Sequence, residues 1–147
     1  MNAQELVQDF YSSIEKKQST HALSLLSEDF VFSGATPVPL NKHQYVSTME
    51  ALAAAMPDFS FGYKLVKVNG SDVEATLELT GTQTADLVLP IPGIPRVPAT
   101  GKKVHLPKEK VELTTRNGLL TSFKVENTPN GGVTGILQQL GVALPHA

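Results

Sequence analysis

The chemistry open to this sequence depends first on one carboxylate, that of Glu109. By alternation along a predicted strand, Glu109 shares a face with Val111 and Leu113. On a buried apolar face the carboxylate loses hydration, its pKa rises, and it becomes a useful general acid or base. The alternative is that a bulge at Pro107 turns the side chain outward to pair with a neighbouring lysine. Glu109 is therefore a candidate catalytic residue.

His105 is the second candidate for proton transfer, because it lies two positions before Pro107. An imidazole titrates near neutral pH, so an inward-pointing His105 would assist Glu109. The alternative is a histidine at a strand edge that is hydrogen-bonded to backbone. The sequence has no cysteine, and its other three histidines have no spacing typical of metal ligands. We predict no metal site and no cofactor.

Neutral polar side chains are candidates for orienting a ligand. Gln83 is in register with Leu77 and Leu79, so its amide is expected to face the interior and to bind a carbonyl or hydroxyl group. A plain core position is the alternative for Gln83. Tyr45 and Tyr63 would add hydroxyl groups to the same site, although both are also typical of core aromatics with satisfied hydroxyls.

Two patterns that often signal catalysis are incomplete. The glycines Gly131, Gly132 and Gly135 lack the spacing and the following lysine of a phosphate-binding loop, which favours a flexible start to the last helix. The sequence contains no GxSxG elbow and no recognisable Ser-His-Asp arrangement.

Helices are predicted in the first third of the chain. Apolar residues recur with helical spacing over residues 4–18, and a second, short helix follows. Asn41 is the predicted N-cap of a third helix, with Gln44 in the capping-box position. This helix ends before Pro57 and directs Met49 inward as a ligand contact.

The rest of the chain alternates with a period of two, which is typical of strands with one buried face. Asn-Gly pairs at 69–70 and 117–118 predict hairpins. Phe123 and Val125 share the inward face of the last strand and are candidate ligand contacts. A proline-rich flap within residues 81–110 joins two strands and is suited to covering a pocket. Helices followed by strands predict an α+β fold with a largely antiparallel sheet.

Length and composition limit the function further. The 147 residues, with 41% hydrophobic and 18% charged residues, predict a single domain spanning 1–147. A net charge of −2 gives no general attraction to nucleic acid or to an anionic membrane. No apolar run approaches the roughly 20 residues of a membrane span. We expect a cytoplasmic protein that binds neither nucleic acid nor membrane.

Six segments carry a resemblance to a known family, and they follow one another in the family's order. They are residues 5–11, 25–32, 56–59, 81–84, 99–104 and 135–141. Together they resemble the nuclear transport factor 2-like superfamily, specifically its polyketide-cyclase-like (SnoaL-like) branch. The resemblance implies a cystatin-like cone, in which a curved, mostly antiparallel sheet packs on N-terminal helices.

The sequence departs from this family at two positions that matter for catalysis. Cyclase-like members often have histidine where this chain has Gln83. They also tend to have an acid near the end of the final strand, a position that falls at about Val125 here. Glu126 is adjacent, but alternation directs it to the other face. An apolar residue at the acid position cannot move a proton, which argues against the usual cyclase chemistry.

Three functions follow as hypotheses. The first is a small-molecule-binding protein whose apolar internal pocket takes a hydrophobic or aromatic ligand. The second is a cofactor-free isomerase, cyclase or hydrolase that uses Glu109, assisted by His105 or Gln83. The third is a homodimeric association module, because members of this superfamily often dimerise through the open sheet face.

Overall fold

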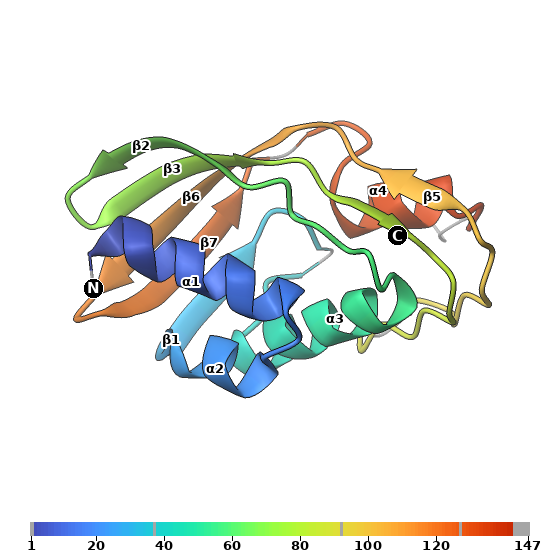
Figure 1. The fold of residues 1–147 in the computed structure, drawn as a ribbon, viewed down its shortest axis with the longest axis horizontal. Coiled ribbons are helices and arrows are strands. Elements are labelled where there is room, and N and C mark those ends of the chain that lie inside the picture. The colour runs from blue at the N-terminus through green and yellow to red at the C-terminus, as the bar shows by residue number, and fades with distance from the viewer. Residues whose placement is uncertain (1, 37, 92, 127, 143–147) are drawn as a thin grey trace.

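A computed structural model of the protein describes residues 2–36, 38–91, 93–126 and 128–142. Four helices and two sheets make up this part of the chain (Figure 1). The helices are α1 (Ala3–Glu15), α2 (Ser19–Ser24), α3 (Lys42–Ala55) and α4 (Gly132–Gln139). None of them is long and apolar enough to cross a membrane.

The capping box predicted for the third helix is confirmed. The Asn41 side chain accepts a hydrogen bond of 2.9 Å from the Gln44 backbone nitrogen, and the Gln44 side chain accepts one of 2.9 Å from the Asn41 backbone nitrogen. These two bonds satisfy N–H groups that the first turn of a helix cannot pair internally. They fix the start of α3, and with it the position of Tyr45.

A five-stranded sheet forms the second layer, in the order β1-β7-β6-β3-β2. Its strands are β1 (Leu26–Ser33), β2 (Lys64–Asn69), β3 (Asp72–Leu77), β6 (Glu109–Arg116) and β7 (Leu119–Val125). Strand β1 runs parallel to β7, and the other neighbouring pairs are antiparallel. A separate pair, β4 (Thr80–Thr82) and β5 (Lys103–His105), extends the structure at one end.

Both predicted hairpins are present. Strands β2 and β3 meet at Asn69-Gly70, and β6 and β7 meet at Asn117-Gly118. Asn117 has φ = 53° and Gly118 has φ = 76°, the left-handed pair that a tight hairpin turn requires. The turn sets the register of β6 against β7, and therefore which residues of β6 face the interior.

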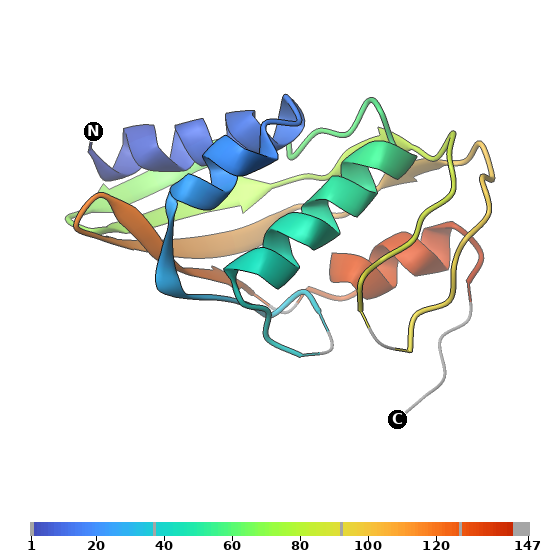
Figure 2. The same cartoon turned by 90° about the horizontal axis from the view of Figure 1, so that it is seen from below.

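The helices lie on one face of the sheet (Figures 1 and 2). Helix α1 packs on β2, β3 and β7, whereas α3 packs on β1. Along β3 the side chains of Val73, Ala75 and Leu77 are buried under the helices, while Glu74 is exposed on the opposite face. Helix α4 lies against β5 at the end farthest from the β2–β3 hairpin (Figure 1). The predicted α+β fold, with a curved and mostly antiparallel sheet, is confirmed.

Candidate functional site

An apolar cavity lies between the helices and the inner face of the sheet. Side chains from β1, α3, β3, β6, β7 and α4 line it, and about 40 Å³ is free inside. Aromatic and aliphatic groups make up most of the wall, including Phe32, Leu52, Phe61 and Leu77. Glu109 is the only charged side chain among the described residues of this lining.

Glu109 begins strand β6 and points into the cavity. It pairs in register with Leu77 of β3, and 4% of its surface is exposed. The regular pairing contradicts the alternative in which a bulge at Pro107 turns Glu109 outward. Desolvation raises the pKa of the Glu109 carboxyl, and a hydrogen bond from the backbone nitrogen of Gly132 partly opposes that shift. The site therefore holds a carboxylate that protonates more readily than one in water.

Two glycines at the start of α4 allow the helix to approach this carboxylate. The Gly132 nitrogen lies 2.9 Å from Glu109 Oε1. A Cβ atom on Gly131 would lie 2.5 Å from the same oxygen, closer than a side chain tolerates. Gly132 has φ = 67°, a backbone conformation that residues with a side chain rarely adopt. A Cβ atom there would also lie only 2.8 Å from the backbone oxygen of Ala35. Sequence reasoning interpreted these glycines as a flexible segment and missed their contact with Glu109.

Four of the predicted ligand contacts lie in the cavity wall. Tyr45 and Met49 reach it from α3, and Phe123 and Val125 reach it from β7. Val125 pairs with Val111 on β6, and Glu109 lies two residues before Val111 on the same face. Glu109 thus lies on the strand next to the apolar Val125, at the same end of the cavity. Burial also raises the pKa of Tyr45, which keeps its hydroxyl group neutral.

Gln83 is fully buried, but the described cavity lining does not include it. Its Nε2 group donates hydrogen bonds to the backbone oxygens of Val97 (3.0 Å) and Pro98 (3.2 Å). Its Oε1 accepts from the hydroxyl of Thr100 (2.6 Å) and from the Thr100 backbone nitrogen (3.2 Å). The Gln83 amide therefore holds the proline-rich flap in position, a role that requires long-range contacts invisible in local sequence.

His105 is exposed at the strand edge and is not among the described residues of the cavity lining, so of the two orientations considered from sequence the inward one does not hold. Its Nε2 atom lies 2.6 Å from Glu78 Oε2, and both side chains are largely exposed. The hydrogen bond to His105 lowers the pKa of Glu78. Strand β5 belongs to the small second sheet, so alternation along it does not continue the inner face of β6. Nothing in this geometry brings His105 to Glu109.

Tyr63 also lies outside the described cavity lining. Its ring centroid is 4.9 Å from that of Tyr11, and neither hydroxyl group has a hydrogen-bond partner among the described residues. The pKa of Tyr11 is raised, first by burial and then by the nearby Tyr45 and Tyr63. These tyrosines form a layer behind the cavity wall, since the Tyr11 ring also packs at a tilt against Phe61, which lines the cavity.

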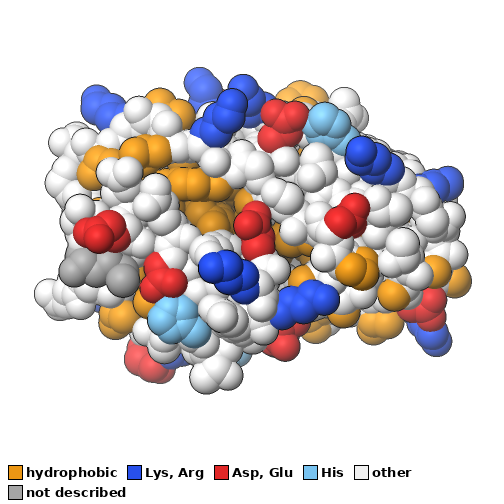
Figure 3. Space-filling model, viewed as in Figure 1, with side chains coloured by type: hydrophobic (Ala, Val, Ile, Leu, Met, Phe, Trp, Pro, Cys, Tyr) orange, Lys and Arg blue, Asp and Glu red, His pale blue; other side chains and the backbone are white. Residues whose placement is uncertain are grey.

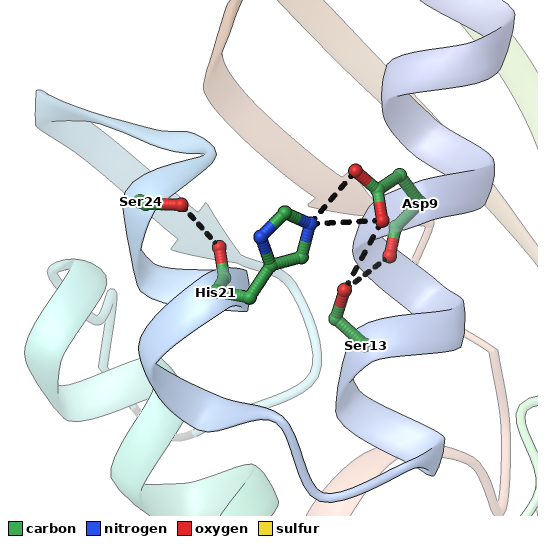
Figure 4. A network of polar contacts seen from close by, with 4 residues as sticks. All are labelled: Asp9, Ser13, His21 and Ser24. Atoms are coloured by element: carbon green, nitrogen blue, oxygen red, sulfur yellow. Dashed lines mark hydrogen bonds and ion pairs between the residues drawn. The ribbon is translucent and has the colours of Figure 1, made fainter.

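A serine, histidine and aspartate cluster joins α1 to α2 (Figure 4). His21 Nε2 lies 2.9 Å from an oxygen of Asp9, and Ser13 donates to the Asp9 backbone oxygen at 2.6 Å. Ser24 donates to the backbone oxygen of His21, so no serine hydroxyl contacts the imidazole in Figure 4. A nucleophilic serine needs that contact to lose its proton. The cluster tethers two helices and is no catalytic triad.

The described residues contain no group of three histidine, aspartate or glutamate side chains arranged to hold a metal ion. On the face seen in Figure 3, acidic and basic side chains are interspersed. Such mixed charge differs from the basic stripe that a nucleic acid would require.

The sequence of this chain matches the SnoaL-like domain over residues 7–123. The chain belongs to the SnoaL-like family. The family is part of the nuclear transport factor 2-like superfamily, so the resemblance found from sequence is confirmed. No curated protein matches this SnoaL-like chain.

Solved structures agree with this assignment. A proposed polyketide cyclase from Pseudomonas putida KT2440 has 21% identity, with 89% of this chain and 95% of that chain covered and a TM-score of 0.69. AclR from Streptomyces galilaeus, a proposed hydroxylase, has 17% identity, 95% coverage of both chains and a TM-score of 0.72. TsrD from Streptomyces laurentii has 22% identity, 95% coverage of both chains and a TM-score of 0.69. At such identities the likeness establishes the fold alone.

Proposed function

We propose that this SnoaL-like protein binds a small hydrophobic or aromatic molecule in the cavity and that Glu109 transfers a proton on it. One observation carries the proposal: a single, almost fully buried carboxylate faces an otherwise apolar cavity. Burying a carboxylate without a cationic partner costs free energy, so structural reasons alone do not favour it. A raised pKa also brings the group nearer to neutral pH, where general acids and bases work best.

Glu109 supplies the acid that the Val125 position lacks. In this proposal the proton-transfer group lies on β6 and not at the end of the neighbouring strand β7, and both positions are at the same end of the cavity. The Gly132 N–H group fixes one carboxylate oxygen and leaves the other to the ligand. A positioned carboxylate of this kind acts without a cofactor.

The reaction that fits best begins with proton abstraction from a carbon next to a carbonyl group. Glu109 takes the proton, the C–H electron pair forms a C=C bond, and the carbonyl oxygen receives the negative charge. Return of the proton to another carbon isomerises the ligand, and attack of the carbanion on a second carbonyl carbon closes a ring. Apolar walls favour the first step because they leave the Glu109 carboxylate poorly hydrated, which raises its pKa and makes it a stronger base.

Deuterium exchange of an aromatic ketone tests the proposal directly. The probe is 2-tetralone in D₂O, and NMR follows loss of the proton signals next to the carbonyl. We expect the wild-type protein to accelerate exchange above the buffer rate. In Glu109→Gln the rate in excess of buffer should fall at least about tenfold. His105→Ala is the matched control and should keep it. The proposal fails if the wild type gives the buffer rate or if Glu109→Gln exchanges as fast as the wild type.

A homodimer formed through the outer sheet face is a second proposal, compatible with the first. That face carries exposed charges of both signs on adjacent strands, such as Glu112 beside Lys124, with Lys110 two residues before Glu112 on the same strand. A face with both signs is able to match its own copy across a twofold axis. Dimerisation there would leave the cavity, on the opposite side of the sheet, free for ligand.

Sedimentation velocity distinguishes this dimer from a monomer. The wild type should sediment as a dimer at micromolar concentration, and Lys124→Glu should shift it toward monomer because it replaces the cation beside Glu112 with another acid. Lys16→Glu, on the exposed end of α1, is the control that should leave the dimer intact. A wild type that stays monomeric at every concentration would exclude this arrangement.

A further inference from the structure

An outer chamber adjoins the inner cavity. The chamber lies between the loop after β1, the turn before α4 and the first turns of α4, and it has a volume of about 340 Å³. Four residues line both spaces: Ala35, Thr36, Glu109 and Gly132. Glu109 therefore stands at the boundary, and its hydrogen bond to Gly132 forms part of the shared wall.

The volumes show that the inner cavity alone is too small for an ordinary ligand. Small-molecule sites usually enclose about 300–1,000 Å³. The inner cavity has about 40 Å³, enough for a few atoms, whereas the outer chamber has about 340 Å³. A molecule that reaches Glu109 in this conformation must place most of its atoms in the outer chamber.

The two spaces differ sharply in chemistry. The inner wall is mostly hydrocarbon, and its polar groups are the side chains of Glu109 and Thr36, the Tyr45 hydroxyl and the backbone of the shared glycine. The outer wall is rich in neutral hydrogen-bonding groups and has a second carboxylate. Its polar side chains other than Glu109 are Thr36, Glu126, Thr128, Asn130, Thr134 and Gln138. No lysine, arginine or histidine is among the described residues of this wall.

We propose that the outer chamber binds a neutral, hydroxyl-bearing part of the ligand and most of an apolar part, while only the edge of the apolar part enters the inner cavity beside Glu109. This inference rests on the proposed function, and it narrows the ligand class to neutral amphipathic molecules. Amide and hydroxyl side chains both donate and accept hydrogen bonds, which suits ligand hydroxyl groups. An anionic ligand is disfavoured, because it would meet two carboxylates and no neighbouring cation among the described wall residues.

The wall groups are available for such contacts. Asn130, Thr134 and Gln138 are exposed to the chamber side of α4 and of the turn before it. The Thr36 hydroxyl donates to the Val38 backbone oxygen at 2.6 Å, so its oxygen still has acceptor capacity. The chamber thus offers several partners to a sugar-like group without requiring any of them to break a buried contact.

Three naphthalene probes test this inference by fluorescence titration: 2-naphthol, 2-naphthyl β-D-glucopyranoside and 2-naphthyl phosphate. The chain has no tryptophan, so naphthyl emission is free of indole background. We expect the glucoside to bind about tenfold more tightly than the naphthol and the phosphate to bind more weakly than both. Thr134→Val combined with Gln138→Leu should remove the higher affinity for the glucoside and leave the affinity for the naphthol unchanged. Glu126→Lys should strengthen phosphate binding.

Gln8→Leu, on the exposed side of α1, is the matched control and should change none of these affinities. If 2-tetralone exchange depends on Glu109 but the glucoside gains nothing over the naphthol, this inference fails and the proposed function stands. If the phosphate binds as tightly as the glucoside, the charge argument fails. If no naphthyl compound binds and 2-tetralone exchange stays at the buffer rate, both proposals fail.

Discussion

The Oε1 atom of Glu109 accepts a 2.9 Å hydrogen bond from the backbone nitrogen of Gly132. This contact joins the first residue of β6 to the first residue of α4, two elements separated by β7 in sequence. It places the buried carboxyl group at the amino end of a helix, where the helix dipole favours negative charge. Desolvation still dominates, because the pKa of the group is raised overall.

Replacing Glu109 with glutamine should change how stability depends on pH. The pKa of Glu109 in the folded protein lies above its ordinary value of 4.5, so folding opposes ionisation of this group. Wild-type stability should gain from this group as pH falls through the raised pKa toward 4.5. A glutamine side chain does not titrate, so the melting temperature of Glu109→Gln relative to wild type should be highest at neutral pH and decline as the pH falls.

Thermal melts of both proteins between about pH 4.5 and pH 8 measure this difference. Glu126→Gln is the control, because it removes an exposed carboxylate just after β7 and leaves Glu109 in place. A constant offset between wild type and Glu109→Gln would show that burial leaves the Glu109 pKa unshifted.

Gly131→Ala should destabilise the protein through Glu109 itself. Gly131 has φ = −99°, which alanine adopts freely, so the cost comes from the Cβ atom that would lie 2.5 Å from Glu109 Oε1. Overpacking of this kind typically costs about 1–3 kcal/mol. Urea denaturation of Gly131→Ala, Glu109→Ala and the double variant measures the coupling. We expect the double variant to be more stable than additivity predicts by at least about 0.5 kcal/mol. Additive losses would refute the contact.

Gln83→Ala should loosen the proline-rich flap. The substitution removes the side-chain bonds to the backbone oxygens of Val97 and Pro98, although Val97 keeps its bond from the Leu87 backbone nitrogen. We expect a loss of about 1–3 kcal/mol in urea denaturation. Trypsin cleavage after Arg96, inside the flap, should become faster at temperatures well below the melting point. Gln8→Ala is exposed and should alter neither readout. An unchanged cleavage rate in Gln83→Ala would mean that other contacts hold the flap.

Tyr11→Phe should raise stability or leave it unchanged. The Tyr11 hydroxyl is buried and has no hydrogen-bond partner among the described residues, and such a group costs about 1–3 kcal/mol of desolvation. Its removal keeps the ring contacts with Phe61 and Tyr63. Urea denaturation should therefore give a gain of up to about 1 kcal/mol. A loss of more than that would reveal a partner for the hydroxyl, such as an ordered water.

Local sequence determined most of the secondary structure of this protein. The change from helical spacing to a period of two predicted the order of helices and strands, and the Asn-Gly pairs predicted both hairpins. Asn41 and Gln44 predicted the start of α3. The period-two alternation also predicted Glu109 on the inner face, because alternation is a property of the strand backbone and holds wherever a strand continues.

Only tertiary structure decided the roles of Gln83, His105 and the glycines before α4. Alternation could not be carried across the break between β3 and β4, so it did not reveal that Gln83 bonds to the flap. It left both an inward and a strand-edge His105 open, and the separate pairing of β5 with β4 decided for the strand edge. The approach of Gly131 and Gly132 to Glu109 joins residues more than 20 positions apart. Such contacts depend on how loops close and helices pack, which local periodicity does not encode.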